Sequence, residues 1–587
     1  MTTTLKVCTS ILIGFLCVFT TSNLQASNIY TYPTVELFEN IHSGTDKKRF
    51  VEDATYFTLN EKALTQINQQ KLETMMPQIP FGASKKLEVN LQRVNVLADD
   101  FKVTVQSGDI HNTLSYSPSL FYRGAISGEK DAMIAINFFQ ESITGVLSLN
   151  GENYNIGQFG TDGTYVIYQE RNLNASNPFA CSTEDLKEMI VTRTGNAGAR
   201  STNTVEVYVE CDHDLFKANG SSIQNTVDFT TGLFNVISAI YAIDDIDVQL
   251  SEIKVWDTAD AYPTSSAKAA RDGFGNALNG NFNGDVAHLL SNYKVNGTVP
   301  NGGSANIDAL CDKEKAVGYT NITTNYKDFP TYSWTAYAVT HEIGHNLGSP
   351  HTHSCLWPTG PIDNCWCPEG DCDQGDEPAA TGGTVMSYCH LNPQWTNDCD
   401  LSASNPGINL ANGFGALPGE LIRSRIANAN CLGGSGSANF PFQATASIQD
   451  EACHQRNGAI ELTVSYGQTP YTYRWSNGAT TKNLTNIAAG TYSCTITDAK
   501  GARTNVRVTV KGSEPFTINA GADQVIGCAE PIVTLDGSDS PNSFSYNYLW
   551  TSIDARLFGN VRKETITVSE PGTVSYTHLT LPTILLV

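Results

Sequence analysis

The stretch from position 341 to position 351, HEIGHNLGSPH, constrains this chain more than any other feature. On a helix, His341 and His345 lie four positions apart, so both imidazoles project from one face and can hold one zinc ion. Gly348 permits the backbone reversal that ends a helix, and the chain can then bring back His351 as a third ligand. The sequence therefore predicts a metal-binding helix followed by a sharp turn.

Glu342 follows the first histidine, where its carboxylate can accept a proton from metal-bound water. Three neutral histidines leave the ion strongly Lewis acidic, and the fourth coordination position stays open for water and substrate. These residues predict a hydrolase site in which Glu342 is the general base for attack on a peptide carbonyl. A short HExxH motif also occurs by chance, but Gly348 and His351 fix two further positions.

The first 26 residues predict an export signal, because Lys6 precedes a short apolar run at 11–19 and Ala26 offers a small residue for cleavage. That run is shorter than the roughly 20 residues that span a bilayer, and no later stretch is long enough, so we expect no transmembrane segment. The formal net charge of -23 disfavours nucleic-acid partners. Most cysteines lie between Cys311 and Cys431, as expected for disulfides in an oxidising compartment. We therefore expect the protein to be secreted, and we consider attachment to the cell surface as a further option.

Alternating apolar and polar residues predict a mostly β unit over residues 27–200. The pattern is clear at 86–91 (KLEVNL) and at 101–105 (FKVTV), where every second residue is apolar. Small residues at 194–201 (TGNAGARS) are typical of a flexible linker and of a site of proteolytic cutting.

Strands at 205–209 and 248–255, with an apolar helix between them, predict an α/β unit over residues 201–433. After a Gly/Ser linker, closely spaced short strands predict two small β-sandwich modules, over 441–512 and 513–575. The expected fold class is a multidomain chain with a β-rich unit, an α/β unit and two C-terminal β-sandwiches.

The pattern HExxHxxGxxH is the signature of the metzincin clan of zinc endopeptidases, and this chain resembles that clan. The clan has a Met-containing turn beneath the metal, and residues 383–388 (GTVMSY) resemble it, with Met386 as an apolar floor. Over residues 85–431 the chain looks most like the reprolysin (adamalysin, ADAM-type) group. The resemblance implies a mixed twisted sheet with an active-site helix, one catalytic Zn²⁺ and a protein or peptide substrate.

The same resemblance assigns further roles. Residues 303–311 resemble the edge-strand region that binds substrate in an extended form, and Cys311 and Cys431 would form a disulfide. The β-rich unit over 27–200 resembles a prodomain, which implies a zymogen. Reprolysins usually have Asp after the third histidine, but this chain has Thr352. Tyr388 resembles instead the tyrosine of astacins and serralysins, which can bind zinc or stabilise the oxyanion.

A prodomain should block the open zinc position until export. Cys181 is the cysteine that the β-rich unit offers, so we hypothesise that its thiolate caps the zinc as a cysteine switch. Its surroundings, FACSTED, match the usual motif only loosely. The α/β unit holds nine cysteines, an odd number, so a disulfide from Cys181 is the alternative.

Other polar residues of the α/β unit carry weaker signals. The acidic stretch at 371–377 lacks an EF-hand pattern, so a Ca²⁺ site there is unsupported. We expect Ser333 to be the N-cap of the helix that bears the histidines. His353 and His390 are expected to be surface or structural residues, because three histidines already complete the site.

The C-terminal modules suggest spacers or adhesion. Residues 441–512 resemble an SprB-type repeat of bacterial surface and secreted proteins, and residues 513–575 resemble a truncated PKD-like sandwich. Both could contact a cell surface or glycans. Residues 576–587 resemble a translated adapter sequence, so we expect a non-native tail and a longer natural protein.

Two other functions compete with a secreted zinc endopeptidase made as a zymogen. The chain could be a surface adhesin with a catalytically idle metzincin-like scaffold, but a scaffold needs no general base such as Glu342. It could also be a zinc exopeptidase or amidase, which the Met386 turn and the strand-like cleft edge disfavour.

Overall fold

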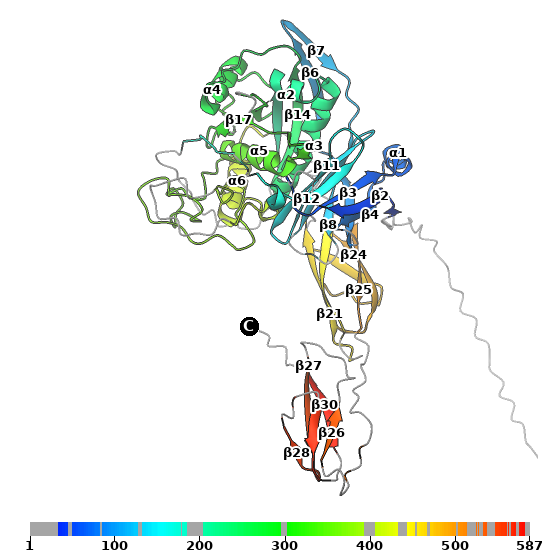
Figure 1. Cartoon of the computed structure of the whole chain (residues 1–587). Coiled ribbons are helices and arrows are strands. Elements are labelled where there is room, and N and C mark those ends of the chain that lie inside the picture. Colours follow the sequence, from blue (N-terminus) through cyan, green and yellow to red (C-terminus); the bar gives the residue numbers. More distant parts are fainter. Residues whose placement is uncertain are drawn as a thin grey trace, which may run out of the picture. The chain divides into compact units, whose positions relative to one another are not determined.

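A computed structural model describes residues 33–580 of the chain (Figure 1). The expected export signal at 1–26 and the whole of the expected linker at 194–201 lie outside the described residues. The residues left out within the described range are 45–49, 83–84, 127–128, 130–131, 176, 178, 185–202, 295–301, 392–405, 433–442, 452–454, 466–469, 500–502, 513–523, 525, 527–531, 537–545, 560–561, 563–564 and 571–573.

The N-terminal unit is built around one large sheet, drawn in blue to cyan in Figure 1, whose described strands run in the order β1-β4-β5-β8-β9-β10-β11-β12-β3-β2. Helix α1 (Glu61–Gln70) contributes Leu64 and Ile67 to a core on the sheet. The strands are β1 (Thr34–Val35), β2 (Phe38–Gly44), β3 (Ala54–Leu59), β4 (Thr74–Phe81), β5 (Lys85–Val94), β8 (Leu120–Ile126), β9 (Met133–Phe138), β10 (Ile143–Leu149), β11 (Glu152–Gln158) and β12 (Tyr165–Gln169).

The α/β unit has a second sheet, whose described strands follow the order β16-β17-β15-β13-β14-β6-β7. Strands β13, β14, β15 and β17 are parallel, and β16 runs antiparallel to β17 at one edge. The strands are β6 (Leu97–Ser107), β7 (Ile110–Leu114), β13 (Thr204–Cys211), β14 (Asp247–Trp256), β15 (Val286–Ser291), β16 (Gly302–Ala305) and β17 (Val317–Asn321).

The hairpin of β6 and β7 crosses the boundary expected from the sequence. Its residues precede position 200, yet β6 pairs in parallel with β14 and so extends the sheet of the α/β unit. Lys102 and Thr104 contact the buried carboxylate of Glu252 on β14, at 3.0 and 2.8 Å. Val96 and Val103 belong to the same hydrophobic core as the residues of β13 and β14. The two units therefore share one core.

Helix α3 (Ile223–Ile243) lies between the two sheets. It contacts β14 on one side and β9 on the other, which explains why every residue of β9 is buried and why all but Asn137 are apolar. Arg123 Nε donates to Asn235 Oδ1 at 2.9 Å, and Asn137 Nδ2 donates to the carbonyl of Gly232 at 3.0 Å. Helix α3 is long and apolar enough to cross a membrane, but 83% of that window is buried inside the protein. It therefore has the character of a core helix.

The remaining helices of the α/β unit are α2 (His213–Ala218), α4 (Ala267–Leu278), α5 (Tyr332–Asn346) and α6 (Ala416–Asn428). Short elements complete both units: the strands β18 (Asn325–Tyr326) and β19 (Phe329–Pro330), and the 3-10 helices η1 (Glu170–Asn172) and η3 (Leu410–Asn412). Helix α5 packs against α3 and the strands β16 and β17, which places its buried side chains beside the sheet edge.

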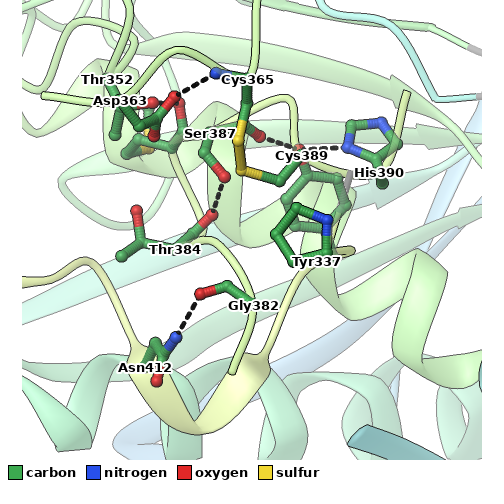
Figure 2. The surroundings of a disulfide bond; sticks show 12 residues. Tyr337, Thr352, Asp363, Cys365, Gly382, Thr384, Ser387, Cys389, His390 and Asn412 are labelled. Carbon is green, nitrogen blue, oxygen red and sulfur yellow. Dashed lines mark hydrogen bonds between the residues drawn. A yellow bond between two sulfur atoms is a disulfide. The ribbon is translucent and has the colours of Figure 1, made fainter. Parts of the chain in front are cut away.

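Disulfides hold the loops on either side of α5. Cys311 and Cys431 are joined, with a Cα–Cα distance of 5.4 Å, and Cys355 is joined to Cys372. A third bond joins Cys365 to Cys389, as Figure 2 shows. Because this segment has little regular structure, the covalent links replace hydrogen-bonded elements in fixing it.

The C-terminal residues form separate β modules, drawn in yellow to red in Figure 1. The first has two three-stranded sheets around a core that contains Trp475. In the second, β30 continues to Thr580 and pairs with β27, so it reaches into the expected non-native tail. The strands are β20 (Gln443–Gln449), β21 (Gly458–Ser465), β22 (Thr472–Trp475), β23 (Leu484–Ile487), β24 (Gly490–Thr497), β25 (Arg503–Val510), β26 (Val533–Asp536), β27 (Tyr546–Ser552), β28 (Leu557–Phe558), β29 (Thr565–Val568) and β30 (Val574–Thr580).

Candidate metal centre and active site

Helix α5 carries the first part of the site. Asn155, from the β-rich N-terminal unit, pairs with polar groups at the start of this helix. Its Oδ1 accepts from the Ser333 backbone N–H at 2.8 Å, and its Nδ2 donates to Ser333 Oγ at 2.9 Å. The expectation that Ser333 is the N-cap is therefore wrong: Thr331 holds that position, without a side-chain cap, and Asn155 satisfies the amide of Ser333. Gly348, at a φ of 111°, follows the end of α5 and supports the predicted sharp turn.

The three predicted histidine ligands converge. His345 Nε2 lies 3.1 Å from His341 Nε2 and 3.2 Å from His351 Nε2, and all three side chains are fully buried. The Nδ1 atoms point elsewhere: His341 Nδ1 contacts the carbonyl of Val385 at 2.8 Å, and His345 Nδ1 contacts that of Ser349 at 2.7 Å. A carbonyl accepts but cannot donate, so these two rings carry their protons on Nδ1.

This arrangement fits a zinc ion. With protons on Nδ1, the Nε2 lone pairs face one another and cannot pair among themselves. Tetrahedral zinc with bonds of 2.0–2.1 Å places its ligand nitrogens about 3.3 Å apart, close to the spacing in this site. Burial, followed by the neighbouring histidines, lowers the pKa of His341 and of His345, which keeps both rings neutral, as metal ligands must be.

Met386 lies in the Gly-rich turn, next to Val385, whose carbonyl contacts His341 Nδ1. It is fully buried, and a Cβ at Gly344 on α5 would come within 2.9 Å of its sulfur, so the turn and the helix are in close contact. Figure 2 shows the turn beside the Cys365–Cys389 disulfide, with Ser387 Oγ donating to the carbonyl of Thr384 at 2.8 Å. A role for Met386 as an apolar floor beneath the metal stays a prediction.

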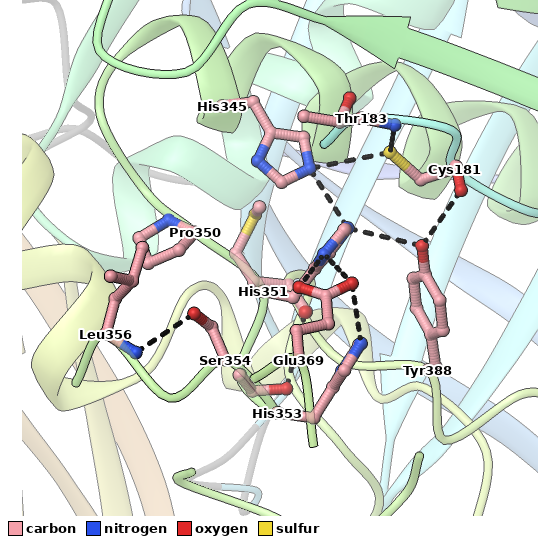
Figure 3. A network of polar contacts seen from close by, with 12 residues as sticks. Cys181, Thr183, His345, Pro350, His351, His353, Ser354, Leu356, Glu369 and Tyr388 are labelled. Atoms are coloured by element: carbon pink, nitrogen blue, oxygen red, sulfur yellow. Dashed lines mark hydrogen bonds and ion pairs between the residues drawn. The ribbon is translucent and has the colours of Figure 1, made fainter. Parts of the chain in front are cut away.

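Cys181 approaches the cluster from the N-terminal unit. Its Sγ lies 3.5 Å from His345 Nε2, and it groups with the three histidines as a potential metal ligand (Figure 3). Cys181 is a free thiol, and so is the buried Cys211. The odd number of cysteines is therefore accounted for by Cys211, because Cys367 is disulfide-bonded. Burial and then the Glu342 carboxylate raise the pKa of the Cys181 thiol.

The segment around Cys181 lies along the edge strand β16. Ser182 N–H donates to the carbonyl of Gly303 at 2.8 Å, and Gly303 N–H donates to that of Ala180 at 3.2 Å. The pairing of Cys181 with Gly303 is parallel. Position 303 must be glycine, because a Cβ there would overlap the carboxylate of Glu342. The segment therefore occupies the cleft edge that was expected to bind substrate.

Phe179 anchors this segment. Its ring is 2% exposed and meets the rings of Tyr337 and His341 edge to face, each at a centroid distance of 5.5 Å. His390 Nε2 lies 2.9 Å from the carbonyl of Phe179, so the half-buried His390 has a structural role. An aromatic plug thus fills a pocket beside the first histidine.

Glu342 is fully buried on α5, and burial raises its pKa to about 8. Thr183 Oγ1 donates to Glu342 Oε2 at 3.2 Å and so covers the carboxylate in this form of the chain. A carboxyl with a pKa raised in this way is suited to exchanging a proton near neutral pH.

Tyr388 lies beside His351 and the Cys181 segment. Its hydroxyl is 3.2 Å from His351 Nε2 and donates to the carbonyl of Cys181, also at 3.2 Å (Figure 3). Burial, followed by the Cys181 charge, raises the pKa of Tyr388, so the hydroxyl keeps its proton and can donate.

Sequence reasoning missed Glu369, whereas His353, expected to be a surface or structural residue, is buried. Both lie against His351: Glu369 contacts its Nδ1, and the His353 ring stacks on it at a centroid distance of 4.9 Å (Figure 3). Burial opposes ionisation of Glu369, but hydrogen bonds from His351 and His353 outweigh it and hold the pKa of the carboxyl below its usual range. No sequence signal links a loop carboxylate to a histidine 18 positions away.

Two family models match this chain. Residues 201–397 match Reprolysin_5, described as metallo-peptidase family M12. The chain carries a reprolysin-like metallopeptidase domain. Residues 445–480 match the SprB repeat, so this metalloprotease also carries that surface-associated repeat. The family implies a hydrolase with a metal and a protein substrate, and the disulfides suggest an extracellular protein.

Two solved structures resemble parts of the reprolysin-like chain. The crystal structure of metalloproteinase-II from Bacteroides fragilis aligns with 14% identity and a TM-score of 0.28, over 49% of this chain and 84% of that one. The structure of a chaperone-substrate complex aligns with 14% identity and a TM-score of 0.25, over 49% of this chain and 44% of that one.

Proposed function

We propose that this protein is a secreted zinc-dependent endopeptidase, made as a zymogen, that hydrolyses peptide bonds in extracellular proteins. One observation carries the proposal: three buried Nε2 atoms converge at 3.1–3.2 Å beside the buried carboxylate of Glu342. An idle adhesin scaffold would gain nothing from a buried general base, because burying an ionisable group costs stability.

His341, His345 and His351 would hold the ion, which would supply a Lewis acid and an acidified water. Glu342 takes a proton from the attacking water and returns it to the leaving amine. The hydroxyl of Tyr388, which keeps its proton 3.2 Å from His351 Nε2, would donate to the developing oxyanion. Met386, which is fully buried in the Gly-rich turn, would serve as an apolar floor for the site.

Substrate would replace the segment at 179–183. The N–H and carbonyl of Gly303 on β16 now bond Ala180 and Ser182, and they would become available to an extended peptide once that segment leaves. Main-chain bonds of this kind hold a chain at any point along its length, which favours an endopeptidase over an exopeptidase.

Latency follows from the same contacts. Cys181 is a free thiol 3.5 Å from His345 Nε2, which supports a role as a cysteine switch. Burial alone disfavours its thiolate, but a cation at the centre of the histidines would reverse that preference. Cutting within residues 185–202 and releasing the segment would open the site.

The SprB-type module and the PKD-like module would act as spacers that present the enzyme outside the cell, with cell-surface or glycan contact. Their cores contain none of the metal-binding groups found among the described residues.

The test uses the full chain, purified with its bound metal measured, and then activated by limited proteolysis. We expect about one zinc ion per chain and cleavage of casein that stops with a chelator and returns with zinc. Glu342→Gln is the matched control, which should retain zinc and the fold but lose turnover by at least about 100-fold. Full activity in that variant, or a zinc-free folded chain, would refute the proposal.

A further inference from the structure

Glu369 stands out among the groups around the metal centre. Both of its carboxylate oxygens lie 2.9 Å from His351 Nδ1, and Oε1 also lies 3.3 Å from His353 Nε2. The side chain is 30% exposed, so the carboxylate keeps part of its hydration while it bonds the buried ring. Figure 3 shows Glu369 between the two histidines.

The position of Glu369 is fixed by the backbone of a disulfide-closed loop. Its N–H donates to the carbonyl of His353 at 3.0 Å, and its carbonyl accepts from the N–H of Cys355 at 3.1 Å. Cys355 is bonded to Cys372, three residues after Glu369. Gly370, at a φ of 125°, allows the close turn, because a Cβ there would come within 2.9 Å of the Cys355 sulfur.

His351 differs from the other two histidines in the group that its Nδ1 atom contacts. His341 and His345 bond neutral main-chain carbonyls through Nδ1, whereas His351 bonds a carboxylate. A carboxylate on Nδ1 fixes the proton there, leaves the Nε2 lone pair free, and makes that nitrogen a stronger donor to a metal.

We propose that Glu369 is a positioning residue for the third ligand, His351, a proposal that rests on the proposed zinc site. The Cys355–Cys372 disulfide then sets metal affinity by holding Glu369 against His351. Reduction of that one disulfide then weakens zinc binding without touching a ligand. In an oxidising compartment the bond stays closed and the site stays tight.

A separate metal site formed by His351, His353 and Glu369 fits the contacts less well. These three groups could surround an ion. However, such an ion would need the Nδ1 lone pair of His351 while Nε2 serves the first site, so the ring would have to lose both protons. A single proton between Nδ1 and the carboxylate satisfies both atoms.

The first test measures zinc affinity of the full chain by competition with a chromogenic chelator. We expect Glu369→Ala to bind zinc about 10- to 100-fold more weakly than the wild type. Glu369→Gln should recover part of the loss, because its carbonyl can still accept from Nδ1. Asp371→Asn, an exposed change two residues away, is the matched control and should stay within about twofold.

The fold is monitored separately. Circular dichroism of the metal-free chain should show the same folded structure for all variants, since the claim concerns metal affinity and not folding. Wild-type affinity in Glu369→Ala overturns the inference. If the wild type itself binds no zinc, the proposed function fails first, and the two failures are thus distinguishable.

The second test separates the loop from the carboxylate. Replacing Cys355 and Cys372 with serine should weaken zinc binding in the wild type but cause no further loss in the Glu369→Ala background. An equal loss in both backgrounds would show that the disulfide acts independently of Glu369 and would overturn the proposed coupling.

Discussion

Replacing Phe179 with alanine should raise the basal peptidase activity of the uncut chain. Phe179 is 2% exposed and packs against Tyr337 and His341. Removing a buried phenylalanine side chain costs about 3–5 kcal/mol. That cost falls only on the closed state, in which the segment at 179–183 covers the cleft, because Phe179 loses these contacts when the segment leaves.

The expected magnitude follows from the equilibrium between closed and open segments. A loss of about 3 kcal/mol multiplies the open fraction by about 100 or more, as long as the closed state remains dominant. Activity toward a quenched fluorogenic peptide, measured on chain shown by electrophoresis to be uncut, should rise by the same factor. Adding Glu342→Gln should abolish the signal, which excludes a contaminating protease.

The matched control is Phe81→Ala. Phe81 is partly buried in the N-terminal sheet and pairs with Tyr154, away from the cleft. It should lower the melting temperature without raising activity. If Phe179→Ala leaves basal activity at the wild-type value while the chain stays folded, the segment is not held by this aromatic plug and the reasoning is refuted.

Three further predictions concern the stability and assembly of the chain. Burial lowers the pKa of His288 from 6.5 to about 3, so the unfolded chain binds the extra proton first and stability falls as pH drops below 6.5, by about 1.4 kcal/mol at pH 5.5. Urea unfolding at pH 7.5 and 5.5 should show a smaller pH effect in His288→Gln than in the wild type; an equal effect contradicts this assignment. Cutting the chain within residues 185–202 should leave both fragments in one gel-filtration peak, because β6 pairs with β14 in a shared core; separation without denaturant would contradict this. Trp475→Ala should lower the free energy of unfolding of the SprB module by about 3–5 kcal/mol, seen in calorimetry as a lower unfolding temperature. Zinc binding should stay unchanged, since Trp475 lies in that module's own core.

The residues that sequence could place are those whose partners are local. His341, Glu342 and His345 lie on successive turns of one helix, and Gly348 ends it, so periodicity alone predicts how they converge. Asn155, which bonds Ser333 at the start of that helix, comes from a strand 178 positions earlier. Ser333 is a good N-cap by residue type, and only the folded N-terminal unit shows that another side chain supplies the acceptor.

The same distinction applies to the strand at 101–105. Its alternation predicts a strand, but alternation describes only which faces are apolar and carries no information about the neighbouring strand. Strand β6 joins β14 because Lys102 and Thr104 bond Glu252, a contact across some 150 residues.

Cysteine parity shows how a valid rule can mislead when it is applied to one candidate. An odd count requires one unpaired thiol, and the sequence made Cys181 the obvious partner for it. In the structure the unpaired residue of the α/β unit is Cys211, which lies fully buried at the end of β13 with its sulfur 3.3 Å from Thr230 Oγ1. Burial raises the pKa of Cys211 to about 12, so it stays an unreactive thiol and needs no partner even among oxidised neighbours. Parity therefore constrains how many thiols are free, while burial decides which ones, and that is why Cys181 remains available beside His345.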